Sequence, residues 1–342
     1  MKTGTFQPIM KASAREVRVA LLSAALLVAF SARGADTAQS APAAPDAPEP
    51  EVLELTRPVS AVEVGAGFVD ASGDRLKAGD YNGLQRKGLF AIGNLDLRGG
   101  GEYYNGDATR WRLDGTNLGL DSRSLSGEYG VQGRYRLTGG FSQLRHITGT
   151  SYETPFVNPG SDALLLPAGW VTSASTAGMS GLAASLHRFT VDTMRKRYDF
   201  GVQAQLAPQW EATASYRRDT KDGTVLQGAQ GPSAFFALRG LLAPMPVGMT
   251  TDQFDAGLVF AGKTAQFQIG YYGSLFKNDT NAFTWQSPYD PGTPTQRMSE
   301  EPTNQFHQVN VTGGFNFSPT TRITAHGSVG RMTQNETFLP YN

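Results

Sequence analysis

Apolar and polar residues alternate with a period of two along much of the chain, which is the period of a β-strand with one face in an apolar environment. One clear pair of runs places its apolar residues at Phe254, Ala256, Leu258 and Phe260 and then at Ala265, Phe267, Ile269 and Tyr271. Only residues 261–264 separate the two runs. We therefore predict a hairpin with a tight turn, in which Gly262 is free to take a positive φ.

The same strand–turn–strand unit recurs along the chain. Alternating runs flank turns at 207–209 and 318–320, others lie near 125–131 and 135–141, and weaker ones lie near 60–69, 88–98 and 109–118. The total is about eleven strands, most of them nine to thirteen residues long. That length suits a tilted membrane strand of roughly 9–11 residues better than a globular strand of about 5–6.

The connections between these strands alternate in length. The turns at 207–209, 261–264 and 318–320 are short, whereas the segments 148–195, 220–251 and 277–304 are long and rich in Gly, Ser, Pro, Asn and Asp. Short periplasmic turns and long external loops are typical of outer-membrane barrels. We predict an all-β protein, with an antiparallel up-and-down transmembrane β-barrel of about 11–12 strands over residues 59–342. A secreted β-sandwich or solenoid also has alternating strands, but it fits this alternation of loop lengths poorly.

Strand parity assigns the two faces of the predicted barrel. The aromatic and aliphatic parity faces lipid, with Tyr198, Trp210, Tyr271 and Phe317 as expected members of the interfacial girdles. The opposite parity faces a polar lumen, where we expect contacts to a partner from Glu128, Arg134, Arg136, Asp199, Glu211, Arg217 and His326. The plainer interpretation is that these charges neutralise one another and hold water.

The N-terminus has the features of a secretory signal. Basic residues precede the apolar run 19–30, and small residues follow it at 32–34. We predict a signal peptide at 1–34, a flexible Ala/Pro-rich periplasmic linker at 35–58, and location in the bacterial outer membrane. The apolar run is too short to span a bilayer as a helix, and no later stretch is long enough, so insertion must be by strands.

Composition excludes several functions. Lys and Arg total 30, as do Asp and Glu, so no basic excess indicates a nucleic-acid partner. Cysteine is absent, which excludes disulfides, thiolate metal sites and covalent haem attachment by this chain. The four histidines lack metal-ligand spacing and no G-x-S-x-G occurs. We expect no catalytic residue, metal or bound cofactor; an outer-membrane hydrolase remains an alternative.

The stretch 257–264, GLVFAGKT, matches the phosphate-loop pattern G-x-x-x-x-G-K-[ST]. A phosphate loop requires a helix to begin at its Lys-Thr, because the phosphates bind the N–H groups of that helix. The residues after Thr264 continue as a strand pattern, so we predict a hairpin turn and no nucleotide binding. The apolar segment 234–242 in a long loop is expected to form a short helix in the barrel mouth or a docking patch, through Phe235, Phe236, Leu238, Leu241 and Leu242.

Several segments in order resemble the MtrB/PioB family of decahaem-associated outer-membrane proteins, from about residue 81 to the end of the chain. They are Tyr81–Leu84 (YNGL), Gly93–Arg98 (GNLDLR), Gly115–Ser124 (GTNLGLDSRS), Gly133–Arg136 (GRYR), Thr154–Phe156 (TPF), Ser215–Arg218 (SYRR), Lys221–Thr224 (KDGT), Thr251–Phe254 (TDQF), Asn304–Gln308 (NQFHQ) and Gly330–Gln334 (GRMTQ).

The resemblance implies a barrel that holds a periplasmic multihaem c-type cytochrome in its lumen, so that electrons cross the outer membrane toward or from an extracellular acceptor such as a metal. It also implies docking of an extracellular multihaem cytochrome on the long loops. Haem is expected only on the partner, and this subunit is not expected to be an enzyme. A general diffusion porin is the main alternative, and a secreted adhesin-like protein a further one.

The chain departs from the family in two respects. Some relatives carry an N-terminal C-x-x-C that is absent here, so no role of that motif can be transferred. Family barrels have roughly twice as many strands, and an odd set of about eleven leaves open edges, which lipid does not tolerate. We expect the chain to be the N-terminal part of a larger barrel; a small closed barrel is the alternative.

Overall fold

The computed structural model describes residues 51–52, 58–70, 80, 82–84, 87–102, 106–231, 239–290 and 295–339. The chain divides into two units, Met1–Asp46 and Ala47–Asn342, and everything below concerns the described residues of the second. The predicted signal peptide lies wholly outside the described residues, and the predicted linker lies mostly outside them.

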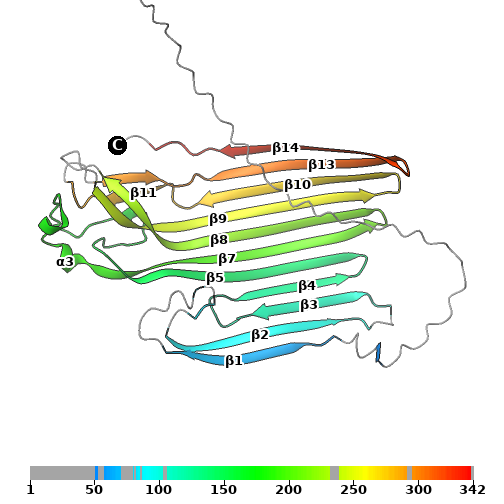
Figure 1. Ribbon diagram of the computed structural model, residues 1–342, viewed down its shortest axis with the longest axis horizontal. Helices are drawn as coiled ribbons and strands as arrows, with labels where there is room; N and C mark the ends of the chain where they lie inside the picture. The colour runs from blue at the N-terminus through cyan, green and yellow to red at the C-terminus, as the bar shows by residue number, and fades with distance from the viewer. Residues whose placement is uncertain are drawn as a thin grey trace, which may run out of the picture. The chain divides into compact units, whose positions relative to one another are not determined.

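Eleven antiparallel strands form one sheet, in which the strands lie side by side in the order in which they occur along the chain (Figure 1). In spatial order they are β1 (Ala61–Val69), β2 (Gly88–Gly100), β3 (Thr109–Thr116), β4 (Ser124–Val131), β5 (Tyr135–Thr154), β7 (His187–Ala207), β8 (Trp210–Gly231), β9 (Arg239–Ala261), β10 (Ala265–Asn278), β13 (Asn304–Ser318) and β14 (Thr321–Gln334). This order confirms the predicted up-and-down arrangement. The sheet is open, with β1 and β14 at its two edges, as expected for part of a larger barrel and not for a small closed one.

The short turns lie at one end of the sheet and the long connections at the other (Figure 1). The GLVFAGKT stretch is a hairpin, because β9 ends at Ala261, β10 begins at Ala265, and the two strands pair from Ala261 and Gln266 onward. No helix begins at Thr264, so the geometry that a phosphate loop requires is not present at this stretch.

Gly262 does not adopt a positive φ, so that detail of the turn prediction is wrong. The turn closes when the Gly262 N–H donates to the carbonyl of Ala265 at 2.9 Å. A Cβ on residue 262 would lie 2.9 Å from that same oxygen and 3.0 Å from the Phe260 ring. The turn therefore needs glycine because the chain approaches itself closely here.

Four strands are much longer than the predicted nine to thirteen residues. β5, β7, β8 and β9 have 20, 21, 22 and 23 residues, and they extend into segments 148–195 and 220–251, which were predicted to be loops. The rest of the long connections forms a second, three-stranded sheet in the order β12 (Thr295–Ser299), β11 (Ala282–Gln286), β6 (Ala163–Leu164). Two short helices accompany it, η1 (Thr176–Gly178) and α3 (Leu182–Ser185). Among the described residues, no helix is long and apolar enough to cross a membrane.

The large sheet has two chemically distinct faces, and the registers show which residues share each one. One row across seven strands is aromatic or aliphatic throughout: Leu137, Val202, Ala214, Ala256, Tyr271, Val309 and Val329. A row on the opposite face consists of Gln205, Glu211, Val259, Gln268, Thr312 and His326. We call these two surfaces the apolar face and the polar face. Large apolar side chains such as Phe200 (62% exposed) have no cover within the chain, as expected for a face in contact with lipid.

Candidate functional site: the polar face of the sheet

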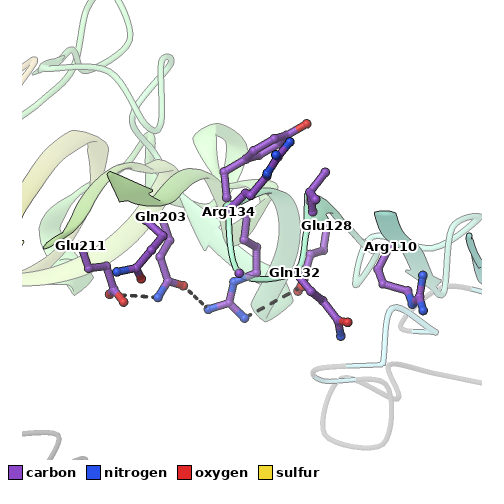
Figure 2. Close-up of a pocket in the computed structure, with 12 residues that line it drawn as sticks. Arg110, Glu128, Gln132, Arg134, Gln203 and Glu211 are labelled. Carbon is purple, nitrogen blue, oxygen red and sulfur yellow. Dashed lines mark hydrogen bonds and ion pairs between the residues drawn. The ribbon is translucent and has the colours of Figure 1, made fainter. Parts of the chain in front are cut away.

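The polar face carries a group of charged and amide side chains next to the short turns, which we call the rim cluster: Glu128, Arg134, Arg136, Gln203 and Glu211. These residues come from β4, the turn before β5, β5, β7 and β8. They line a hollow of about 320 Å³ (Figure 2), which Arg110 and Gln132 also line. The register places them together, because Glu128 and Arg136 lie on paired strands and Arg136 is the direct partner of Gln203.

Hydrogen bonds run along the rim cluster. Gln203 donates from Nε2 to Glu211 Oε1 at 3.0 Å, and Arg136 donates to Gln203 Oε1 at 2.8 Å. Arg136 Nη1 also lies 3.9 Å from Glu128 Oε1. The Arg136 and Glu128 side chains are 55% and 50% exposed, so their ion pair contributes at most about 1 kcal/mol to stability. Side chains that contribute so little to folding are available for contact with a partner.

The other predicted lumen residues also lie on the polar face, but the structure does not bring them into the rim cluster. Asp199 and Arg217 are register partners on β7 and β8. His326 lies on β14 opposite Thr312, several strands away from the cluster. Parity therefore placed these residues on the correct face, whereas only the register shows which of them meet.

Further charges on the polar face were not selected from the sequence. Asp219 lies between Arg197 at 3.1 Å and Arg195 at 3.2 Å, near the loop end of the face. Near the turn end, Arg112 lies within 2.6 Å of Asp114 and 3.6 Å of Asp96. The alternating parity that selected Arg136 applies equally to these residues and could have identified them.

The charges are unevenly distributed across the polar face. From β2 to β9 the face carries both signs, whereas on β10 and β13 its described polar residues are amides and hydroxyls: Gln266, Gln268, Tyr272, Ser274, Asn304, Gln308, Asn310, Thr312 and Asn316. A partner on this face would meet charged groups on β2 to β9 and uncharged hydrogen-bonding groups on β10 and β13, with Arg322 of the edge strand β14 donating to Gln266 Oε1 at 2.6 Å.

The apolar face ends at a polar boundary near the long connections. Arg218 makes two hydrogen bonds to Asp252, at 2.7 and 2.9 Å, and the Tyr216 hydroxyl donates to the same carboxylate at 2.6 Å. From Phe254 on this side to Phe260 near the turn, β9 rises about 20 Å at about 3.4 Å per residue. This is close to the apolar band of about 25 Å in outer-membrane barrels.

The structure places the predicted girdle residues on the apolar face. Tyr198 and Tyr271 are 40% and 39% exposed, and Phe317 is 64% exposed. Trp210 packs against Phe260 near the turns, with the ring centroids 4.9 Å apart and the rings tilted by 45°. Tyr198, opposite Arg218, and Trp210 and Phe317 near the turns thus lie at the two ends of the apolar band, as at membrane interfaces. Tyr271 lies inside the band, in the same row as Ala214 and Ala256.

The structure describes only part of the predicted docking patch. Phe235, Phe236 and Leu238 lie outside the described residues. Leu241 and Leu242 are in strand β9 and not in a helix; Leu241 packs against a buried core, and Leu242 is 63% exposed. Over the described residues, no group of three His, Cys, Asp or Glu residues could hold a metal ion.

These features define an outer-membrane β-barrel protein, with an apolar face toward lipid and a polar face toward the lumen. The chain belongs to the MtrB/PioB family, because residues 70–342 match the family model described as a putative outer membrane beta-barrel porin, MtrB/PioB. It is 32% identical over 233 residues to outer membrane protein MtrB of Shewanella baltica (strain OS185). The match covers 67% of this chain and 33% of that protein, so the chain spans about a third of the length of this relative.

Solved structures give a weaker similarity. The chain resembles OmpT, an outer membrane protein of Vibrio cholerae, with a TM-score of 0.33 and 10% identity over 80% of this chain and 66% of that one. The trimer form of OmpT has a TM-score of 0.30 and 9% identity over 80% of this chain and 81% of that one. Similarity at this level carries no functional information.

Proposed function

We propose that this protein is a sheath that holds a periplasmic multihaem c-type cytochrome in its lumen, so that electrons cross the outer membrane. Membership of the MtrB/PioB family is the observation that carries this proposal. The chain has no cysteine for haem attachment, so the partner would carry all the haem. In this role the barrel supplies position and insulation, and it is not an enzyme.

The polar face supports the proposal by its chemistry. It carries charges of both signs over β2 to β9 and mainly uncharged amides and hydroxyls on β10 and β13, so it can pair with a partner surface of mixed charge. The rim cluster lies at the turn end, which faces the periplasm when the strands run outward from an exported N-terminus. A periplasmic cytochrome would meet the rim cluster first as it enters the lumen.

Deletion of the gene and purification of the protein test the proposal together. Deletion should abolish electron transfer to or from an extracellular acceptor, and affinity purification in mild detergent should recover a haem-staining partner. Normal extracellular electron transfer in the deletion strain would contradict the proposal. So would recovery of the intact protein without any haem protein.

A general diffusion porin is the second candidate, because the matching family model is described as a porin. A porin would conduct ions in planar bilayers without a haem partner, and small hydrophilic solutes would cross the membrane faster when it is present. The sheath predicts low conductance while the cytochrome is bound. Measuring conductance before and after removal of co-purifying haem protein separates the two functions.

A further inference from the structure

The three long connections do not extend separately into solvent; they share one buried core. The core consists of Phe156, Leu164, Ala229, Ala243, Met245, Phe283 and Trp285. Phe283, Leu164 and Ala243 are 0–1% exposed. We call the assembly of β6, β11, β12 and the segment around Phe156 the loop cap.

The loop cap packs against one particular face of the long strands. β8 and β9 pair from Trp210 and Phe260 to Gly231 and Arg239 without a register shift, so odd-numbered residues stay on one face along their whole length. Near the turns these odd positions are Glu211 and Thr213, on the polar face. Beyond the apolar band the same positions are Ala229, Ala243 and Met245, which belong to the core of the loop cap.

Backbone hydrogen bonds also attach the loop cap to the free edge of β9. β10 pairs with β9 only as far as Met249. Beyond that point Gly160 donates to the carbonyl of Pro244 at 2.9 Å, and Asp279 donates to that of Gly248 at 2.8 Å. On the opposite face of this strand Leu242 is 63% exposed, whereas Pro244 is fully buried.

We propose that the loop cap covers the outer mouth of the lumen and bars hydrophilic solutes. The polar face is the lumen face, and the core of the cap is built on its outward continuation, so the folded loops lie over the opening. This barrier is independent of what fills the lumen. The folded loops would thus stop small molecules from diffusing between the lumen and the outside of the cell.

The absence of cysteine allows a direct test with single-cysteine reporters in the full-length protein in cells. Ser215→Cys places a thiol on the polar face below the cap, and Leu242→Cys places one on the open outer face. A bulky membrane-impermeant maleimide is added to intact cells and the labelling rates are compared. Ser215→Cys should react slowly and Leu242→Cys quickly.

Disrupting the cap should then expose the lumen reporter. Phe283→Ala with Trp285→Ala removes two core rings, and we expect the Ser215→Cys labelling rate to rise about tenfold as the cap opens locally. Leu165→Ala is the matched control, because Leu165 belongs to the same connection as β6 but is 46% exposed; it should leave the rate unchanged. Replacing residues 281–299 with a short Gly-Ser linker removes the β11–β12 hairpin and should give the same increase.

Two results would overturn the proposal: rapid labelling of Ser215→Cys in the intact protein, or an unchanged slow rate after both cap alterations in protein that still assembles. Assembly is checked by heat-modifiable mobility on gels. The labelling rates are measured in a strain that cannot mature c-type cytochromes, so that no haem protein shields Ser215→Cys and a rate increase reports on the cap. Recovery of the haem partner from the parent strain tests the sheath separately.

Discussion

At the residue scale, substitutions in the rim cluster should change binding of the partner more than they change the stability of the barrel. Arg136→Ala should lower the stability of the barrel by less than about 1 kcal/mol, because its ion pair is more than half exposed. It should nevertheless reduce the amount of haem protein that co-purifies, since Arg136 links Glu128 and Gln203 on the polar face. Arg188→Ala is the control: it breaks a similarly exposed pair with Glu153 near the loop end. Equal haem recovery from both variants would contradict this role of Arg136.

The turn at Gly262 provides a second prediction about single residues. Gly262→Ala should destabilise the protein by about 1 kcal/mol, because the new Cβ would approach the Ala265 carbonyl to 2.9 Å. Lys263→Ala should have almost no effect, although it removes the lysine of the apparent nucleotide signature. Urea midpoints for the two variants measure the difference. A large effect at Lys263, or ATP binding that depends on it, would contradict the hairpin.

Glu300 leads us to expect that the stability of the loop cap depends on pH. Burial, with the neighbouring Glu301 charge adding to it, raises the pKa of the Glu300 carboxyl, and its Oε1 is buried without a hydrogen-bond partner among the described residues. Because the folded pKa is above the unfolded one, this group favours folding at low pH, and that contribution is lost as pH rises through the folded pKa. Protection of the cap from protease should therefore decrease from pH 4 to pH 7. Glu300→Gln should flatten that change; a wild-type profile in this variant would exclude Glu300 as the cause.

At the scale of the strand, a lysine substitution should have opposite effects on assembly at two adjacent positions, because their side chains lie on opposite faces of the sheet. Ala214→Lys places a charge in the middle of the apolar face, where it should cost about 2–4 kcal/mol. Thr213→Lys, one residue earlier on β8, points to the polar face and should be tolerated. The assembled fraction of each variant in outer-membrane preparations measures the contrast. Equal assembly would show that the faces are assigned incorrectly.

The sequence predicted the strands of the sheet well and the loop cap not at all. The face of residues such as Ala256 and Val309 can be predicted because side-chain direction in a strand repeats every two residues, so a short stretch of sequence is enough to assign it. Phe156 and Leu164 come from one connection and Phe283 and Trp285 from another, no period links the two segments, and only their contacts make them a core. The excess length of β5 and of β7 to β9 was not predicted either. Beyond the apolar band both faces of these strands are covered or leave the lipid, and the alternation fades.

At the scale of the whole molecule, one open sheet combines a lipid surface, a lumen surface and a cap. The apolar band ends at Arg218 and Asp252 near the long connections and near Trp210 at the turn end. The polar face extends beyond the level of Arg218 and Asp252, where its residues become part of the core of the loop cap. The family defines this as an outer-membrane barrel, and the distribution of charge suits a protein occupant. The central claim is therefore that the polar face touches a haem protein.

Site-specific photo-crosslinking tests this claim most directly. A photoreactive amino acid is placed either at Gln203, in the rim cluster, or at the adjacent Val202, in the lipid-facing row, and cells are irradiated. The account predicts a haem-staining adduct from position 203 and none from position 202. The absence of such an adduct at 203, or equal adducts at both positions, would contradict it.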